Sequence, residues 1–504
     1  MKYLQGQHIL ILGLGSSGLA MTRWCAQMGA DVTVADTRES PANLQVLKSE
    51  LPEVQFKSGP FAANLIEGTS VRAVFASPGL APIETLPVIE AAKAMGLWVG
   101  GELSLFVQAL ENLKATRDYA PQVLAITGTN GKTTVTALTG QLIERAGKTV
   151  KVAGNIGPTL LDTLRLSMTT ALPEVWVLEL SSFQLDNAGP FEPSAATVLN
   201  ITQDHLDWHG NMAAYAAAKE KIFGASSLMV LNRDDARVMA MLPEPVRAKL
   251  QKPVVRAHVT YGAEMPQRPG DFGLETVNGM TWLVRALEAD ETRRLRKGEV
   301  EEIHIQRLMP ADALRIRGRH NAVNALAALA LATSTGASLA SMLFGLREYK
   351  GEPHRVEPVA IVNEVEYFDD SKGTNVGATV AALLGLGAER RVVVILGGEG
   401  KGQDFSPLAE PVARYARAVV LIGRDAPLIR EEIKACGVPL IDASTLPEAV
   451  NAAKNMAQAG DAVLLSPACA SFDMFRDYPH RAQVFCQAVA EIAEAAGQVM
   501  EASL

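Results

Sequence analysis

Apolar runs alternate with amphipathic, helix-like stretches along the chain, beginning near the N-terminus. The run His8–Leu12 leads into a glycine-rich turn, a helical stretch to Met28 and a second apolar run, Val32–Ala35. A further apolar run covers Ala73–Ser77. Short apolar strands that alternate with helical spacers are typical of a parallel sheet covered by helices. The first hundred residues therefore predict an α/β fold.

Two later segments repeat this pattern. The strands expected in the middle segment are Val123–Ile126, Val175–Leu180 and Ala196–Asn200, and those expected in the last segment are Val392–Leu396, Ala418–Ile422 and Ala462–Leu465. An alanine-rich helix is predicted for Asn321–Ala332, and the Gly351–Pro353 stretch is predicted to be a hinge. The chain is thus predicted to be α/β throughout.

A glycine-rich turn, Gly-Thr-Asn-Gly-Lys-Thr at 128–133, connects the Val123–Ile126 strand to a predicted helix over Thr134–Arg145. The N–H groups of such a turn and of the helix N-terminus favour anions. Lys132 would add a positive charge at the β- and γ-phosphates of a nucleotide, and Thr133 an oxygen ligand for Mg²⁺. Ile126 stands where the usual phosphate-loop spacing has its first glycine, so this motif needs support from the rest of the chain.

A second glycine turn, Gly13-Leu14-Gly15-Ser16-Ser17-Gly18, follows the first strand, and Asp36 lies 18 positions beyond its last glycine. This is the dinucleotide-binding pattern in a strand-to-helix context. The turn recognises a diphosphate, so both NAD and a nucleotide-sugar diphosphate fit it. The Ser77-Pro78-Gly79 turn is expected at the same edge of the sheet.

A chain of 504 residues is too long for a single core. We predict a Rossmann-like N-terminal domain (1–106), a central P-loop-type ATPase domain with a mostly parallel sheet (107–351) and a C-terminal Rossmann-like α/β domain (352–504). Residues 106–122 combine charges, a proline and no strong strand, which predicts a linker. The irregular, charged stretch 262–312, with a hairpin signal at Val277–Met280, is interpreted as a peripheral elaboration.

Composition narrows the class of protein. Apolar residues make up 48% and charged residues 20% of the chain, as in ordinary soluble proteins. No signal peptide and no 18-residue apolar stretch is recognised, and four scattered cysteines favour a reducing cytoplasm. A net charge of −8 argues against broad nucleic-acid binding.

Seven motifs occur in one order along the three segments. They are Gly128–Thr133, Glu179–Gln184, Asp204–Asp207, Gly318–Asn321, Pro353–Arg355, Asp370–Asn375 and Ser466–Asp473. The chain therefore resembles the Mur ligases over nearly its whole length. The Asp370–Asn375 loop and the Rossmann-like first segment favour the branch of the family that adds D-glutamate.

The resemblance implies an ATP-dependent ligase. It would join D-glutamate to UDP-N-acetylmuramoyl-L-alanine through an acyl phosphate and release ADP and phosphate. This reaction belongs to cytoplasmic peptidoglycan precursor synthesis, and so to cell wall biogenesis, cell shape and cell division. A monomer without a membrane span is expected.

The resemblance also implies roles for individual residues. Those expected to carry the chemistry are Lys132, Glu179, His205 and Lys219. One Mg²⁺ would be held by Thr133 and Glu179 and a second by His205 and Lys219, whose amine would be carbamylated to give an anionic ligand. From its sequence context alone, Lys219 would be a surface lysine in helical ion pairs.

The remaining residues fall into three groups by ligand. ATP contacts are expected at Gly128, Thr129, Asn130, Gly131, Lys132, Thr133, Thr134, Asn321, Asn324, His354, Arg355, Asp370 and Lys372. Contacts to the UDP-substrate are expected at Leu14, Ser16, Asp36, Thr37, Arg38, Ser77, Gly79 and Asn155. D-Glutamate contacts are expected at Thr374, Lys401, Ser471, Phe472 and Tyr478, where Tyr478 replaces a different aromatic of the family.

Three other hypotheses stay open at this point. An NAD-dependent enzyme would use the first glycine turn but leave the Lys132 loop unexplained. A non-enzymatic ATP switch would bind ATP without releasing phosphate in response to an amino acid. An L-alanine-adding relative within the Mur ligases would differ only in its amino-acid preference.

Overall fold

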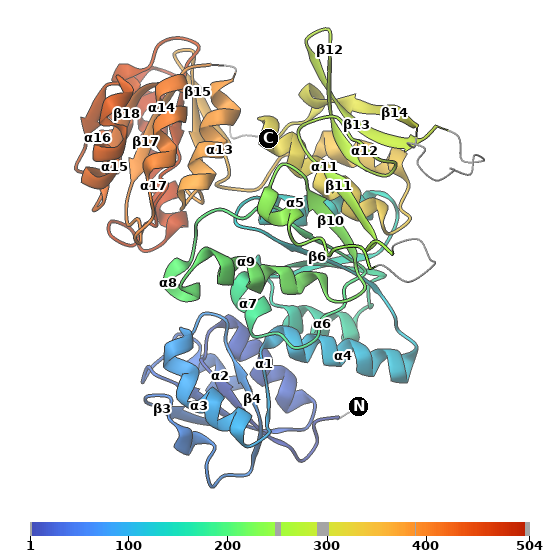
Figure 1. The fold of residues 1–504 in the computed structure, drawn as a ribbon. Coiled ribbons are helices and arrows are strands. Elements are labelled where there is room, and N and C mark those ends of the chain that lie inside the picture. The colour runs from blue at the N-terminus through green and yellow to red at the C-terminus, as the bar shows by residue number, and fades with distance from the viewer. Residues whose placement is uncertain (1–2, 247–253, 290–301, 389, 499–504) are drawn as a thin grey trace.

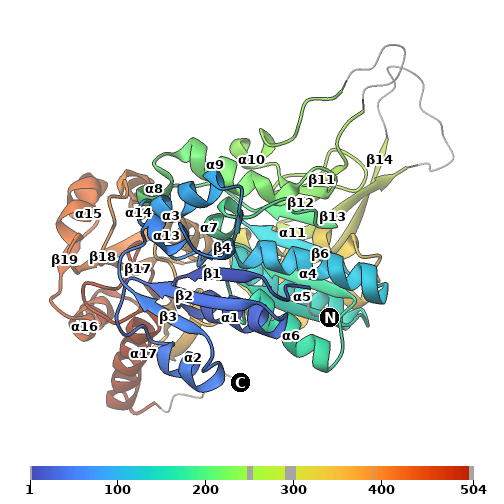
Figure 2. The same cartoon turned by 90° about the horizontal axis from the view of Figure 1, so that it is seen from below.

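The computed structural model describes residues 3–246, 254–289, 302–388 and 390–498. Three α/β units follow one another along the chain, and each is built on its own sheet (Figure 1). The N-terminal unit lies at one end of the molecule, while the C-terminal unit packs beside the central one (Figures 1 and 2). The predicted three-domain α/β class with mostly parallel sheets is confirmed.

The first unit is a five-stranded parallel sheet in the order β3-β2-β1-β4-β5. Alternate residues of the central strand enter two different cores. Ile9 and Ile11 pack on the α1 side, and Leu10 and Leu12 pack on the α3 side, which explains the continuous apolar run. The elements are β1 (His8–Leu12), α1 (Ser16–Gln27), β2 (Asp31–Asp36), α2 (Leu44–Glu50), β3 (Gln55–Ser58), β4 (Val71–Ala76), α3 (Pro82–Ala94) and β5 (Trp98–Gly100).

The central unit has a six-stranded parallel sheet in the order β11-β10-β9-β6-β8-β7. Helices α5 and α11 pack together against one face. The strands are β6 (Gln122–Thr127), β7 (Val150–Gly154), β8 (Val175–Glu179), β9 (Ala195–Val198), β10 (Leu228–Asn232) and β11 (His258–Tyr261). The helices are α4 (Glu102–Arg117), α5 (Lys132–Arg145), α6 (Leu160–Thr169), α7 (Ser182–Asp186), α8 (Leu206–His209), α9 (Met212–Glu220), α10 (Ala236–Met239), α11 (Arg319–Thr333) and α12 (Leu339–Glu348).

The third unit has a six-stranded sheet in the order β15-β16-β20-β17-β18-β19, in which the edge strand β15 is antiparallel. The strands are β15 (Glu357–Val362), β16 (Val365–Asp369), β17 (Val392–Gly397), β18 (Ala416–Ile422), β19 (Leu440–Asp442) and β20 (Ala462–Leu465). The helices are α13 (Val376–Gly387), α14 (Ala409–Tyr415), α15 (Ala426–Ile433), α16 (Leu446–Met456) and α17 (Tyr478–Ala495).

The segment predicted as a linker, residues 106–122, leads from the first sheet to the second. Most of this segment forms the helix α4. The helix ends at Arg117, and the next residue, Asp118, has a left-handed backbone conformation. Phe106, Ala109 and Leu113 are buried against the first two units. These residues recur at helical spacing, a signal that the charged residues between them obscured.

The expected elaboration contains a three-stranded antiparallel sheet of β12 (Phe272–Val277), β13 (Met280–Glu288) and β14 (Ile303–Pro310). The predicted hairpin is confirmed, because Val277 pairs with Met280 and the turn residues Asn278 and Gly279 have positive φ. The inner face of this sheet packs on α11, so the segment belongs to the central core rather than to its periphery. Residues 290–301 of the segment lie outside the described residues.

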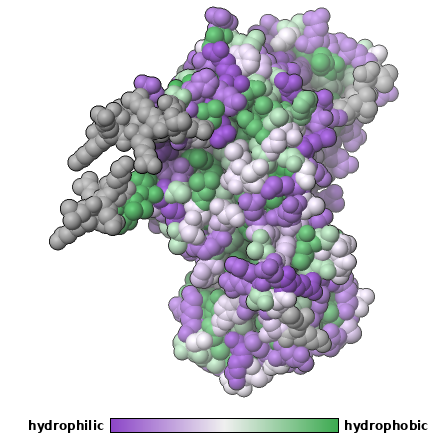
Figure 3. Space-filling model, turned by 90° about the vertical axis from the view of Figure 1, so that its right-hand side faces the viewer, coloured by the Kyte–Doolittle hydropathy of each residue, from purple (hydrophilic) through white to green (hydrophobic). Residues whose placement is uncertain are grey.

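Within the described ranges, no helix is both long enough and apolar enough to cross a membrane. On the face shown in Figure 3, hydrophilic and hydrophobic residues are interspersed.

Candidate active site

The glycine-rich loop turns from β6 into α5 at the carboxyl edge of the central sheet. Gly128 (φ 151°) and Gly131 (φ 83°) both need the conformational freedom of glycine. A Cβ on Gly128 would lie 2.9 Å from the Cβ of Leu199, and one on Gly131 would lie 2.8 Å from Oδ1 of Asn324. The loop therefore sits tightly between β9 and α11.

Lys132 and Thr133 begin α5. The Lys132 ammonium donates hydrogen bonds to the carbonyl oxygens of Gly128 (2.9 Å) and Thr129 (2.8 Å). Burial lowers the pKa of Lys132, against the opposing influence of the Glu179 and Asp204 carboxylates. The ammonium group of Lys132 is thus held at the loop, where the γ-phosphate of a nucleotide is expected.

Glu179 ends β8 and is buried. Its Oε1 accepts a 2.8 Å hydrogen bond from Nδ2 of Asn155, whereas its Oε2 is buried without a hydrogen-bond partner. An unpartnered buried carboxylate oxygen is costly unless a cation neutralises it. Glu179 and the hydroxyl of Thr133 are hard oxygen donors, so the residues fit Mg²⁺.

Lys219 is not a surface lysine. Its side chain on α9 is 1% exposed, and its ammonium donates to Oγ1 of Thr127 (3.2 Å) and to the carbonyl oxygen of Gly128 (2.9 Å). It also lies 4.7 Å from the ring centroid of Tyr215. Burial, and next the charge of Lys132, hold the pKa of Lys219 well below its ordinary value.

His205 is the N-cap residue of α8 and lines a pocket of about 550 Å³ between the central and third units. Its Nε2 lies 3.7 Å from Oδ2 of Asp204, and its ring packs 4.7 Å from that of Phe183. Thr374 and Lys401 of the third unit line the same pocket. The structure thus brings His205 together with two of the predicted D-glutamate residues.

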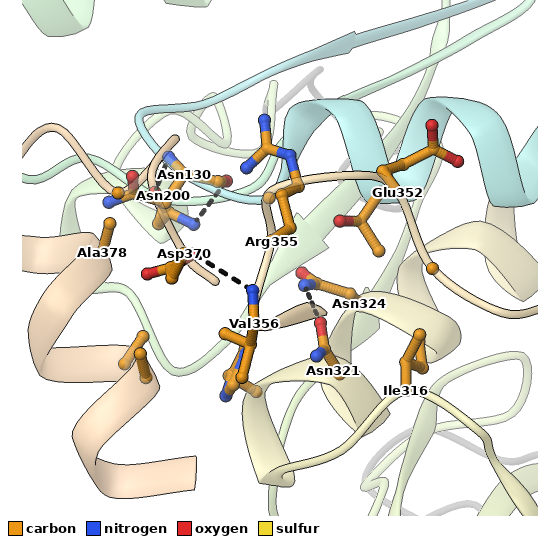
Figure 4. A pocket seen from close by; sticks show the side chains of 17 residues that line it. Asn130, Asn200, Ile316, Asn321, Asn324, Glu352, Arg355, Val356, Asp370 and Ala378 are labelled. Atoms are coloured by element: carbon orange, nitrogen blue, oxygen red, sulfur yellow. Dashed lines mark hydrogen bonds between the residues drawn. The ribbon is translucent and has the colours of Figure 1, made fainter. Parts of the chain in front are cut away.

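A second pocket of about 710 Å³ lies beside the glycine loop (Figure 4). Asn324 donates a 3.1 Å hydrogen bond to Oδ1 of Asn321, and Asn321 donates to the carbonyl oxygen of Arg317 (2.8 Å). Seven residues predicted to contact ATP line this pocket, namely Asn130, Gly131, Thr134, Asn321, Asn324, Arg355 and Asp370.

Side chains of the third unit contact the glycine loop directly. Arg355 donates a 2.6 Å hydrogen bond to Oγ1 of Thr133, and the Lys372 ammonium lies 3.5 Å from the same oxygen. Asn375, which also caps α13, exchanges hydrogen bonds of 3.2 and 3.1 Å with Asn130. These contacts join a site whose parts lie more than 200 positions apart in the chain.

Three titratable groups of this contact region have shifted pKa values. Burial raises the pKa of Asp370 to about 7 and, with the charge of Arg355, lowers that of Lys372 to about 8. The hydrogen bond between Nδ1 of His354 and Oδ2 of Asp369 (2.7 Å) raises the pKa of His354. A strongly polar, partly desolvated environment therefore surrounds the pocket beside the glycine loop.

The predicted D-glutamate residues separate into two places. The Lys401 ammonium lies 5.6 Å from the ring centroid of Phe472, which is 64% exposed, and Ser471 beside it is buried. Tyr478 lies instead 6.0 Å from the ring of His354, on the nucleotide side.

In the first unit, the buried Asp36 holds the glycine turn. Its Oδ2 accepts a 2.7 Å hydrogen bond from the N–H of Leu14, and both of its oxygens accept from Arg38. Burial opposes this charge, but hydrogen bonds from Arg38 and Leu14 lower the pKa of Asp36 to about 2. The Ser77 hydroxyl donates to the carbonyl oxygen of Gly13 (3.1 Å), so the two turns at this edge are in contact.

Two residues at the centre of the site, Tyr215 and Asn375, were not among those predicted from the sequence. The Tyr215 hydroxyl lies 3.2 Å from Oγ1 of Thr129, and its ring lies over Lys219. Its position four residues before Lys219 on one helix face could have indicated the contact. Asn375 belonged to a recognised motif, but nothing in its sequence context points to Asn130.

Family models match three stretches of the chain. The Mur ligase MurD-like N-terminal domain matches residues 7–101, the Mur ligase middle domain matches 126–332, and the Mur ligase glutamate ligase domain matches 354–469. The chain belongs to the Mur ligase family, and it is therefore an enzyme of the ligase class.

Curated relatives identify the branch of that family. The UDP-N-acetylmuramoylalanine–D-glutamate ligase of Albidiferax ferrireducens is 70% identical over 502 residues, which cover 99% of each chain. The enzyme of the same name from Polaromonas sp. is 58% identical over 587 residues, covering 99% of this chain and 100% of the relative. These names confirm the predicted D-glutamate-adding branch rather than the L-alanine-adding one.

Solved structures share the fold. The MurF ligase from Thermotoga maritima in complex with ADP has a TM-score of 0.56 at 16% identity and covers 98% of this chain and 96% of its own. The UDP-N-acetylmuramate-alanine ligase of the same organism has a TM-score of 0.54 at 20% identity and covers 96% and 99%.

Proposed function

We propose that the protein uses ATP to join the carboxylate of UDP-N-acetylmuramoyl-L-alanine to the amine of D-glutamate. The γ-phosphoryl group moves to a carboxylate oxygen, the bond to the β-phosphate breaks, and ADP leaves. The amine nitrogen then attacks the acyl carbon, the bond to the phosphate oxygen breaks, and the amine gives up a proton. The products are the amide and inorganic phosphate.

One observation carries this proposal: a single loop of the third unit serves two pockets. Asp370 and Gly373 line the pocket beside the glycine loop, and Thr374 lines the pocket that contains His205 and Lys401. A nucleotide in the first pocket and an amino acid in the second would meet near the glycine loop. Such a juxtaposition suits a reaction in which a phosphoryl group activates a carboxylate for attack by an amine.

Charge neutralisation is the main task of the protein in phosphoryl transfer. Lys132 on the loop, and Arg355 and Lys372 on the third unit, bring three cationic side chains to the phosphates. Thr133 and Glu179 would hold one Mg²⁺ and His205 a second, and the ions would neutralise charge on the phosphates and the carboxylate.

We further propose that Lys219 carries a carbamate. Its burial favours the neutral amine, which is the form that reacts with CO₂ to give a carbamate and a proton. Carbamylation would replace a buried cation with an anion beside Glu179, and this anion would serve as a ligand for the second Mg²⁺.

The chemistry of the side chains suggests which residues bind the uridine diphosphate and which bind D-glutamate. The turns around Leu14, Asp36 and Ser77 would bind the uridine diphosphate, with the exposed face of Arg38 against the uracil. Lys401 would pair with a carboxylate of D-glutamate, while Thr374 and Ser471 would fix its orientation. We also propose that the second and third domains divide at 351/352, and that the enzyme acts as a monomer in the cytoplasm. The boundary predicted at 106/107 falls inside helix α4, so we place it at the start of that helix, Glu102.

The test is phosphate release from ATP with UDP-N-acetylmuramoyl-L-alanine and a panel of D- and L-amino acids. Release should require D-glutamate and fall to background with L-glutamate or L-alanine. Lys401→Ala should raise the KM for D-glutamate much more than the KM for ATP, while Lys434→Ala, an exposed lysine of the same unit, should change neither. Release that is equal for all amino acids, or absent with D-glutamate, would contradict the proposal.

A further inference from the structure

The chain enters the third unit through an unusual backbone segment. His354 (φ 64°) and Val356 (φ 49°) both adopt left-handed conformations. Residues other than glycine rarely do so, and β-branched valine does so least of all. Such a backbone persists only where surrounding contacts hold it.

Asp369, the last residue of β16, and the next residue, Asp370, accept hydrogen bonds from these two residues, and Glu357 accepts one from the N–H of His354 (2.8 Å). Oδ2 of Asp369 accepts a 2.7 Å hydrogen bond from Nδ1 of His354, and Oδ1 of Asp370 accepts one of 3.3 Å from the N–H of Val356. Asp369 is fully buried, and its Oδ1 accepts from the N–H (2.9 Å) and the hydroxyl (2.6 Å) of Ser371. The Asp369 carboxylate is therefore fixed on both sides.

Arg355 stands between the two anchored residues in the chain, and its side chain points away from Val356 (Figure 4). Its Nη2 donates to Oγ1 of Thr133 on the glycine loop, and its Nε is buried without a hydrogen-bond partner. A guanidinium with a buried, unused N–H beside a phosphate-binding loop suits a phosphate oxygen. The residues on either side are thus anchored in the third unit while the middle one is presented to the nucleotide site.

We propose that Asp369 is a positioning residue: through His354 it maintains the left-handed segment that presents Arg355 to the phosphates of ATP. The inference rests on the proposed function only in taking ATP as the nucleotide at the glycine loop. Without Asp369, the segment relaxes toward ordinary backbone conformations, and the guanidinium leaves the loop. Asp369 itself is assigned no contact with any of the three substrates.

A double-mutant cycle on ATP binding tests this inference. The affinity of the full chain for ATP with Mg²⁺ is measured by calorimetry for the parent, Asp369→Ala, Arg355→Ala and the double variant. Asp369→Ala should weaken binding about tenfold, the usual scale for a hydrogen bond to a charged group. If Asp369 acts through Arg355, the double variant should bind within about twofold of Arg355→Ala.

Asp369→Asn and Asp461→Ala are the matched controls. The amide oxygen of asparagine can still accept from His354, so Asp369→Asn should stay within about threefold of the parent. Asp461 is another buried carboxylate of the third unit and accepts from Nη2 of Arg417 (2.9 Å). Asp461→Ala should leave the affinity for ATP unchanged.

Two results would overturn the inference. The first is an Asp369→Ala variant that binds ATP as tightly as the parent. The second is a double variant whose loss of ATP affinity equals the product of the losses in the two single variants. If Asp369→Ala does not fold, the same cycle with Asp369→Leu, which keeps the volume of the buried side chain but has no acceptor for His354, decides the question. Failure of the D-glutamate panel would refute the proposed function alone, because ATP binding is measured here without an amino acid.

Discussion

The ammonium group of Lys219 donates a 2.9 Å hydrogen bond to the carbonyl oxygen of Gly128, a residue 91 positions earlier in the chain. Helix α9 of the central unit thereby places a buried amine against the glycine loop. Burial lowers the pKa of this amine and so favours its neutral form. The contact links the local chemistry of one lysine to the whole ligase site.

We predict that Lys219→Ala is nearly inactive in phosphate release and that Lys219→Glu does not fully substitute for the parent, because its carboxylate has a shorter reach than a lysine carbamate. Acetate or formate should partly restore the activity of Lys219→Ala, because either anion can occupy the volume that the lysine carbamate leaves. The measurement is activity with and without these acids at matched ionic strength, together with ¹³CO₂ NMR of the parent.

Lys221→Ala is the matched control, since the ammonium of Lys221 pairs with Asp186 at the surface (2.7 Å). This variant should keep parent activity and show no response to acetate. Full activity of Lys219→Ala would refute the role of the lysine, and the absence of a carbamate signal in the parent would refute the modification.

We predict that Lys132→Ala reduces turnover by about 10²–10³, the cost of removing one positioned electrostatic stabiliser. Binding of the UDP-substrate should stay near normal, because the uridine site is assigned to the first unit. Steady-state kinetics measure the turnover, and titration with the UDP-substrate measures its binding. Lys151 is an exposed lysine of β7, so Lys151→Ala serves as the control. Turnover of Lys132→Ala within threefold of the parent would contradict the role of Lys132 in phosphoryl transfer.

A pH dependence of stability follows from Glu102, a buried residue at the start of α4. Burial raises its pKa from 4.5 to about 7, although its Oε1 accepts from the N–H of Leu161 (3.0 Å). The unfolded chain releases this proton first, so the free energy of unfolding decreases as the pH rises from about 4.5 to 7. The loss is complete above pH 7 and amounts to roughly 3 kcal/mol.

Glu102→Gln removes this titration, because a neutral amide has the same shape as the protonated carboxyl. The variant should unfold at the parent's temperature near pH 4.5 and at a higher temperature at pH 8. Glu111→Gln, an exposed position of the same helix, should match the parent at both pH values. If the unfolding temperature of the parent instead rose relative to that of Glu102→Gln as the pH increased, the predicted direction of the pH dependence would be wrong.

The close approach of α13 to the glycine loop gives a test of domain closure. A Cβ on Gly377 would lie 2.8 Å from Oγ1 of Thr202 and 3.0 Å from Nδ2 of Asn130. Gly377→Val should hold the third unit away from the loop and lower turnover about tenfold to a hundredfold, because misplacement by an ångström is costly in catalysis. Phosphate release and the radius of gyration with ATP, Mg²⁺ and an acceptor analogue measure both consequences.

Gly189→Val is the control for this substitution, since nothing lies within 4 Å of a Cβ at Gly189 and its φ is not left-handed. It should keep normal turnover. A Gly377→Val variant as active as the parent, with the same radius in all states, would show that close contact between the units is not needed.

Much of the fold could be predicted from local pattern. Runs such as His8–Leu12 are apolar at every position because both faces of a parallel strand are buried, and this pattern indicated the doubly wound sheets. The hairpin at Val277–Met280 was equally local, because Asn278 and Gly279 tolerate positive φ. Helix α4 was missed because its charged residues share the stretch with Phe106, Ala109 and Leu113.

The sequence by itself determined the local elements and the glycine loop with Lys132, since backbone freedom, burial pattern and motif spacing are properties of short segments. Only the tertiary structure decided that Lys219 is buried, that Oε2 of Glu179 has no partner and that Arg355 reaches Thr133. These facts depend on which surfaces meet when helix α9 and the third unit pack against the central sheet. Desolvation and charge proximity act through space, so no pattern within a segment records them.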